Sequence, residues 1–150
     1  MAGRKKVVTS VVIDRPPAQV FDYLIDVRKH SDWSPKPFRV EGIDGPVSKG
    51  STFTSYGWVP RDSDHRNDVE VTECDAPSRL VLLSREQDEQ FINTFELSAQ
   101  GAGTQLTRTM DMPSPGGFVG LLLPILIPTV IKPDQQKGLN KLKENLEQPA

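Results

Sequence analysis

The sequence has little of what several functional classes require. Cysteine occurs once, at Cys74, so an internal disulfide and a cysteine-based metal cluster are both excluded. The net charge is −2, and the one basic run is Arg4, Lys5 and Lys6, so a binding surface for nucleic acid is not expected. The lone cysteine, together with an N-terminus that lacks the pattern of a signal peptide, predicts a cytoplasmic protein.

Motifs for metal binding and for nucleophilic catalysis are also missing. Asp62, Asp64 and Asp68 lack the glycine and the terminal glutamate of a calcium-binding loop. His30 and His65 have no carboxylate or nucleophile at a spacing that matches a known motif, so surface or capping positions are expected for both. The sequence therefore predicts no cofactor, no metal and no catalytic residue.

No apolar run is long enough to form a membrane-spanning helix. The longest, residues 119–131, includes Pro124 and Pro128, whereas a span needs about 20 apolar residues. Residues 118–131 are nevertheless apolar around too much of a helix for an ordinary surface position. They are expected to line a cavity, to form a mobile flap, or to contact a membrane transiently.

The predicted elements follow one another as one strand, two short helices, six strands and a helical region, within one domain. Residues 5–14 are rich in Val and Ile and predict a strand, and short helices are expected within 17–33. Turn signals divide 38–112 into six strands, which short connections force to pair antiparallel. Residues 115–147 predict a long helical region whose prolines kink or break it.

Several short motifs follow one another along the chain, at residues 16–24, 32–35, 71–80, 95–97, 103–104 and 139–147. In order and spacing they resemble those of one family, the START-like (SRPBCC) superfamily in its polyketide cyclase/dehydrase and lipid-transport branch. This resemblance implies an α+β helix-grip fold, in which a curved antiparallel seven-stranded sheet wraps around a long C-terminal helix. It also implies an internal cavity for lipids, polyketides or other apolar ligands.

Strand parity indicates which side chains face such a cavity. Phe91, Asn93 and Phe95 share one face of their strand, and Arg108 and Met110 share one face of the next. The apolar members place Asn93 and Arg108 inward with them. Side chains from a strand that contains aromatic residues and from the C-terminal helix are also expected to line the cavity. The full set of expected ligand-binding residues is Tyr56, Trp58, Phe91, Asn93, Phe95, Arg108, Met110, Leu122 and Leu126.

The two polar members of this set have alternative roles. An inward Arg108 needs a carboxylate such as Asp68 or Glu70, or an acidic ligand head group, because an uncompensated buried charge is costly. The favoured alternative is that Arg108 lies near the mouth and extends its guanidinium into solvent. Asn93 is expected either to orient a carbonyl or hydroxyl of a ligand or to bond to a neighbouring side chain or water.

Three functions fit these expectations. The first is binding or transport of a hydrophobic small molecule, lipid-like or polycyclic, in the internal cavity. The second is a polyketide cyclase or dehydratase that acts mainly by positioning its substrate. The third is a membrane- or protein-interaction module that uses residues 118–131.

Overall fold

The computed structural model describes residues 3–36, 38–57 and 64–148. Its strands are β1 (Arg4–Ile13), β2 (Phe38–Glu41), β3 (Thr52–Gly57), β4 (Arg66–Asp75), β5 (Arg79–Glu86), β6 (Glu89–Gln100) and β7 (Gly103–Pro113). Its helices are α1 (Pro17–Ile25), the 3-10 helix η1 (Val27–Asp32), α2 (Gly117–Leu126), the π-helical segment η2 (Ile127–Ile131) and α3 (Lys132–Glu147). This order agrees with the prediction from the sequence.

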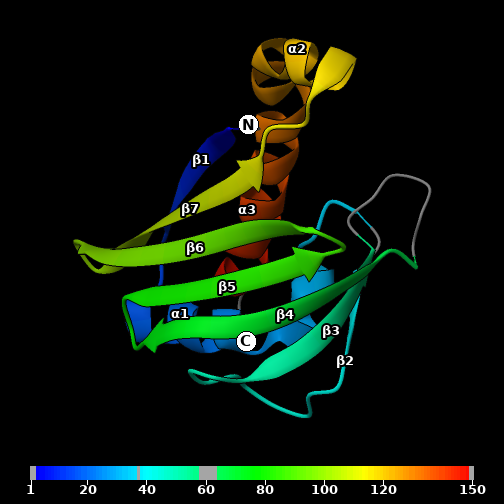
Figure 1. Ribbon diagram of the computed structural model, residues 1–150. Helices are drawn as coiled ribbons and strands as arrows, with labels where there is room; N and C mark the ends of the chain where they lie inside the picture. The colour runs from blue at the N-terminus through cyan, green and yellow to red at the C-terminus, as the bar shows by residue number, and fades with distance from the viewer. Residues whose placement is uncertain (1–2, 37, 58–63, 149–150) are drawn as a thin grey trace.

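The seven strands form one antiparallel sheet in the order β1-β7-β6-β5-β4-β3-β2 (Figure 1). Short turns explain why consecutive strands from β2 to β7 are neighbours. Between β6 and β7, Gly101 has a positive φ of 60°, which glycine adopts without a steric penalty. At the start of β7, a Cβ on Gly103 would lie 2.5 Å from the Ile13 carbonyl oxygen. Glycine at position 103 therefore lets β1 close against β7.

The sheet curves around α3, which crosses its inner side from the open end toward α1 (Figure 1). Leu139 and Leu142 of α3 are fully buried in the same apolar core as Ile13 and Leu106. Gly138 lets the helix approach η1, because a Cβ there would lie 3.3 Å from the Trp33 carbonyl oxygen. The predicted helix-grip fold is thus confirmed.

The C-terminal helical region is irregular at its prolines. Kinks or breaks were expected there, and of the two outcomes residues 117–147 show a local irregularity without a break: they remain helical throughout, with a π-helical turn at Ile127–Ile131. Proline lacks the N–H that an α-helical turn requires, and a local change of helix type accommodates that loss. Within this turn the Thr129 hydroxyl donates a hydrogen bond to the Ile125 carbonyl. The prolines therefore alter the helical geometry without ending the helix.

The packing of α3 predicts that substitutions on its buried and exposed faces change the free energy of unfolding by different amounts. Leu139→Ala should lower the free energy of unfolding by about 2–5 kcal/mol, because it leaves a cavity where the sheet and helix meet. Lys137→Ala, on the exposed face of the same helix, should change it by less than about 0.5 kcal/mol. Urea denaturation of both variants measures this difference, and equal effects would contradict the described packing.

Candidate functional site

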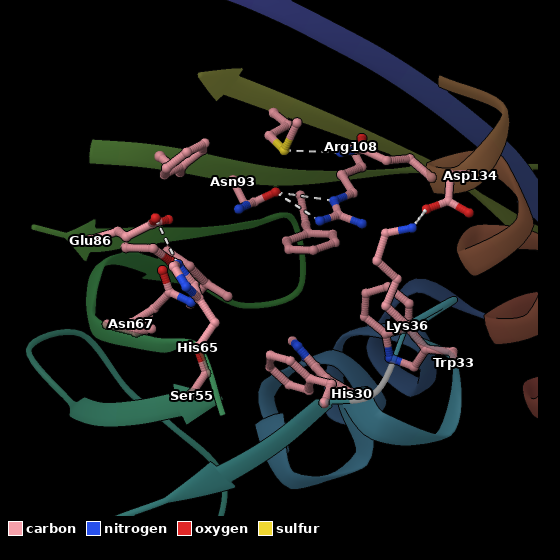
Figure 2. Close-up of a pocket in the computed structure, with 18 of the residues that line it drawn as sticks. His30, Trp33, Lys36, Ser55, His65, Asn67, Glu86, Asn93, Arg108 and Asp134 are labelled. Atoms are coloured by element: carbon pink, nitrogen blue, oxygen red, sulfur yellow. Dashed lines mark hydrogen bonds and ion pairs between the residues drawn. The ribbon is translucent and has the colours of Figure 1, made fainter. Parts of the chain in front are cut away.

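A cavity of about 370 Å³ lies between the inner side of the sheet, η1 and the beginning of α3 (Figure 2). This volume falls within the range of about 300–1,000 Å³ that is typical of small-molecule sites. The wall is largely apolar, with polar side chains at separate points. The lining residues are His30, Trp33, Lys36, Phe38, Phe53, Ser55, His65, Asn67, Val69, Leu82, Ser84, Glu86, Phe91, Asn93, Phe95, Arg108, Met110, Val130, Ile131, Asp134 and Gln135.

Five of the residues that the sequence places in the cavity do line it. Phe91, Asn93 and Phe95 belong to β6, and Arg108 and Met110 belong to β7. The two strands pair so that Phe95 lies opposite Arg108, and Asn93 lies opposite Met110. Alternation along each strand therefore brings all five side chains to the same side of the sheet.

The prediction for the aromatic strand was wrong at Tyr56. In β3 the cavity is lined by Phe53 and Ser55, which leaves Tyr56 on the opposite face. There the guanidinium carbon of Arg39 lies 4.2 Å from the centre of the Tyr56 ring. Trp58 lies outside the described residues. The inward face of β3 was assigned wrongly because its inward positions hold one aromatic residue and one serine, which do not form a uniformly apolar pattern.

The residues through which the C-terminal helical region lines the cavity also lie later in the chain than predicted. Leu122 and Leu126 are half-buried in α2 and are not among the lining residues. Figure 1 shows that α2 projects beyond the end of the sheet, so the chain reaches the cavity only in η2 and α3. From η2 and α3, the lining residues are Val130, Ile131, Asp134 and Gln135. Helical periodicity alone does not indicate where along its length a helix meets the sheet.

Arg108 is buried deep in this cavity, which corrects the expectation that it reaches solvent. Only 2% of the residue is exposed. Its Nε and Nη2 atoms donate hydrogen bonds to Asn93 Oδ1 at 3.1 and 2.9 Å (Figure 2). The guanidinium carbon also lies 5.8 Å from the centre of the Trp33 ring and 5.5 Å from that of Phe95. Asn93 and two aromatic rings thus contact the cation.

The two carboxylates considered as partners for Arg108 lie elsewhere. Asn67 and Val69 of β4 line the cavity, so Asp68 and Glu70 point to the outer face of the sheet. Asp68 forms an ion pair with Arg66 at 3.0 Å, and Glu70 forms one with Arg85 at 3.3 Å.

Burial determines the electrostatic character of the inner cavity. It lowers the pKa of Arg108 to about 10, so the guanidinium is still protonated at neutral pH. One acceptor that it meets, Asn93 Oδ1, belongs to a neutral amide. The faces of Trp33 and Phe95 also contact the cation. The inner cavity therefore carries a positive charge beside polar and aromatic groups.

Three further buried polar atoms lie on the elements around Arg108. Thr9 Oγ1, Trp33 Nε1 and Gln135 Oε1 have no hydrogen-bond partner among the described residues. Thr9 is the β1 residue directly opposite Arg108. Gln135 donates through Nε2 to Met110 Sδ at 2.9 Å, which fixes its amide beside the cavity. Buried polar atoms usually find a partner, so this end of the cavity suits a water molecule or a polar ligand group.

His30 lines the cavity, although a surface or capping position was expected for it. It is buried, and its Nε2 donates a hydrogen bond to the Leu24 carbonyl oxygen at 2.8 Å. Burial, with repulsion from Arg108 as a smaller cause, lowers the pKa of His30 to about 4. The ring is therefore neutral at pH 7, with Nδ1 as its acceptor nitrogen. Val27, His30 and Trp33 recur at intervals of three, which places them on one face of a 3-10 helix and was the available signal.

Two ion pairs lie at the rim of the cavity. Lys36 Nζ lies 2.6 Å from Asp134 Oδ2, joining the segment after η1 to α3 (Figure 2). His65 Nε2 lies 2.7 Å from Glu86 Oε1, joining the residue before β4 to the end of β5. Sequence reasoning missed all four residues, since each pair joins positions far apart in the chain. Within the described parts of the chain, no cluster of His, Cys, Asp or Glu is arranged to hold a metal ion.

Known proteins share the sequence pattern and the fold of this chain. Residues 4–147 match the model of a family described as polyketide cyclase / dehydrase and lipid transport. Protein CV1439 from Chromobacterium violaceum is similar in structure, with 16% identity, coverage of 96% of this chain and 98% of that one, and a TM-score of 0.73. TTHA0849 from Thermus thermophilus has 21% identity, coverage of 95% and 97%, and a TM-score of 0.73.

A third similar structure is DynU16, a protein in the dynemicin biosynthetic locus. It has 15% identity and a TM-score of 0.65, with coverage of 95% of this chain and 47% of DynU16. At these identities the solved structures establish the fold alone. None of the curated proteins matches this chain.

The buried neutral His30 predicts a specific dependence of stability on pH. Its pKa is lower in the folded protein than the usual 6.5, so its contribution is complete above pH 6.5 and is lost as the pH falls toward 4. Between pH 7 and pH 4 the wild type should lose about 3 kcal/mol more unfolding free energy than His30→Gln, whose amide still donates to Leu24. Denaturant unfolding of both proteins across this range measures the difference. A parallel loss in the two proteins would show that His30 is not buried and neutral.

Proposed function

Because this chain belongs to the polyketide cyclase/dehydrase and lipid transport family, we propose that its cavity binds a hydrophobic small molecule, lipid-like or polycyclic, through an acidic or carbonyl oxygen held by Arg108. The observation that carries this proposal is the buried guanidinium inside an otherwise apolar cavity. A fully buried arginine is uncommon and costly, and a ligand oxygen is the kind of group that such a position favours.

The apolar wall supplies the affinity for the body of the ligand. Phe53, Val69, Leu82, Phe91 and Phe95 offer flat and branched surfaces that suit rings or an acyl chain. Burying about 300 Å² of apolar ligand surface contributes about 7.5 kcal/mol at roughly 25 cal/mol per Å². Association costs of about 4–15 kcal/mol offset most of this gain. Useful affinity therefore requires a polar anchor as well.

Arg108 meets the requirements of that anchor. Two of its N–H groups already bond to Asn93, so the orientation of the guanidinium is fixed before the ligand arrives. A hydrogen bond to a charged group contributes about 1.5–3 kcal/mol, which corresponds to roughly a 10- to 150-fold change in affinity. The low polarity of the surrounding wall strengthens the interaction further.

This role is tested with two matched ligands, 2-naphthoic acid and 2-naphthalenemethanol. The wild type should bind the acid at least about tenfold more tightly than the alcohol, because only the acid brings a negative charge to Arg108. Arg108→Met should lose this preference and retain binding of the alcohol. Isothermal titration calorimetry measures both affinities. Equal affinity of the wild type for the two ligands would contradict an anionic anchor.

The variant needs a control for folding. A methionine of similar length replaces a buried charge by an apolar side chain, and such replacements are often neutral or stabilising. Arg108→Met should therefore unfold at a temperature no lower than the wild type does. Arg66→Met, on the outer face of the sheet, is the matched variant and should keep the preference for the acid.

The same end of the cavity supports a second candidate, a cyclase or dehydratase acting on a polyketide. Arg108 would polarise a carbonyl, and the neutral ring of His30 lies near enough that the charge of Arg108 influences its pKa. Holding a flexible chain in a reactive conformation beside these two groups accounts for much of the catalysis that this reaction needs.

This activity has its own test. Incubation with a synthetic poly-β-ketone should give cyclised product faster than a heat-denatured control, and Arg108→Met should reduce that rate by at least about tenfold. Product formation is followed by liquid chromatography with mass spectrometry. A rate equal to that of the denatured control would leave ligand binding as the function.

A further inference from the structure

The exposed apolar side chains of α2 and η2 form a surface that the cavity does not explain. They gather within a short stretch of the chain, and each is between 52% and 77% exposed. We refer to them as the apolar patch, which consists of Phe118, Val119, Leu121, Ile125 and Val130. A concentration of exposed large hydrophobic residues on one element is typical of an interaction surface.

The patch stands clear of the body of the molecule. α2 extends past the ends of β6 and β7, so it is accessible from several sides (Figure 1). Leu123 is the buried residue of α2. From Gln135 onward α3 packs inside the sheet, so the second half of the continuous helix is held by the protein. The first half is therefore available for a partner.

The chemistry of this segment favours lipid over protein. Residues 114–133 contain no Asp or Glu, and their one charged side chain is Lys132. Interfaces between proteins usually surround an apolar centre with polar side chains and place Tyr, Trp or Arg within it. Besides Lys132, the segment offers only the hydroxyls of Ser114 and Thr129 for such contacts. An acyl-chain environment makes no such demand.

Basic residues lie beside the base of the patch. Pairing of β1 with β7 puts Lys5 opposite Met112 and Lys6 opposite Asp111, close to where the chain enters α2. Both lysines are exposed, and Asp111 forms an ion pair with Arg4 at 2.7 Å. Lysines flanking an apolar segment attract anionic lipid head groups. The basic residues and the exposed apolar side chains are thus both features of a surface that binds anionic lipid.

The length of the apolar part of this helix indicates how it would contact a membrane. By length and composition alone, the helix Gly117–Glu147 is long and apolar enough to cross a membrane. Its apolar part, however, comprises the ten residues of α2 and the five of η2, or about 22 Å, less than the roughly 30 Å of a hydrocarbon core. The charged half beyond it is committed to the sheet. Shallow insertion at the interface fits these lengths better than a span.

We propose that the apolar patch inserts into the interface of an anionic membrane, with Lys5, Lys6 and Lys132 over the head groups. Val130 belongs both to the patch and to the lining of the cavity. Docking in this orientation places the rim of the cavity against the bilayer. An apolar ligand then passes between membrane and cavity without crossing water.

Flotation with vesicles tests this proposal. Vesicles of phosphatidylcholine with one-third phosphatidylglycerol should carry the wild type to the top of a density gradient, and vesicles of phosphatidylcholine alone should carry much less. Leu121→Glu with Ile125→Glu should reduce recovery at least about tenfold, because the new charges oppose insertion. Val8→Glu with Val12→Glu, at exposed apolar positions on β1, is the matched control and should float like the wild type.

The outcomes separate this proposal from the alternatives. Circular dichroism should show that both double variants are folded, and Arg108→Met should float normally, since the cavity anchor plays no part in docking. Failure of the wild type to float, or equal flotation of both double variants, would overturn the proposal. So would a wild-type dimer in native mass spectrometry that Leu121→Glu with Ile125→Glu converts to monomer, because the patch would then bind a second copy of the chain.

Discussion

A positive charge enclosed by an apolar interior is the constraint on which the rest of the site depends. Arg108 projects from β7 into the space between sheet and helix, where water contributes little to its solvation. Contacts with the neutral amide of Asn93 and with the faces of Trp33 and Phe95 offset part of the desolvation cost of the guanidinium and orient it within the cavity. A well-packed hydrophobic residue would serve the fold at lower cost, and this is the reason for the proposal that Arg108 binds a ligand oxygen.

The neighbours of Arg108 are adapted to its presence. His30 stays neutral chiefly because it is buried, with the nearby charge of Arg108 as a smaller cause, and its bond to the Leu24 carbonyl fixes the tautomer. Two further contacts of polar side chains, Lys36 with Asp134 and His65 with Glu86, lie at the rim, where solvent weakens electrostatic interactions. Polarity is therefore graded, from one anchoring charge inside, through aromatic walls, to ion pairs at the opening. Such a gradient supports the proposal that an amphipathic ligand binds with its oxygen inward.

The sequence predicted those features that follow from periodicity and order. Alternation along β6 and β7 placed Phe91 and Met110 correctly, because their apolar neighbours leave one consistent inward face. The same rule failed at Tyr56, since β3 turns a serine inward and makes the aromatic face ambiguous. Leu122 and Leu126 were misplaced because the point at which a helix meets a sheet depends on loop geometry and tertiary packing. The depth of Arg108 was underestimated for an energetic reason: burial of a full charge is rarely worth its cost unless function requires it.

The ion pair between Lys36 and Asp134 has a consequence for how long a guest remains inside. It joins positions 98 residues apart across the opening, with each side chain about one-quarter exposed. Ions in solution reach such a contact and weaken it over a screening length of about 8 Å at physiological ionic strength, whereas a buried group such as Arg108 is screened much less. Under the proposed function, the rate of ligand exchange is therefore expected to respond to salt more strongly than the preference for one ligand over another.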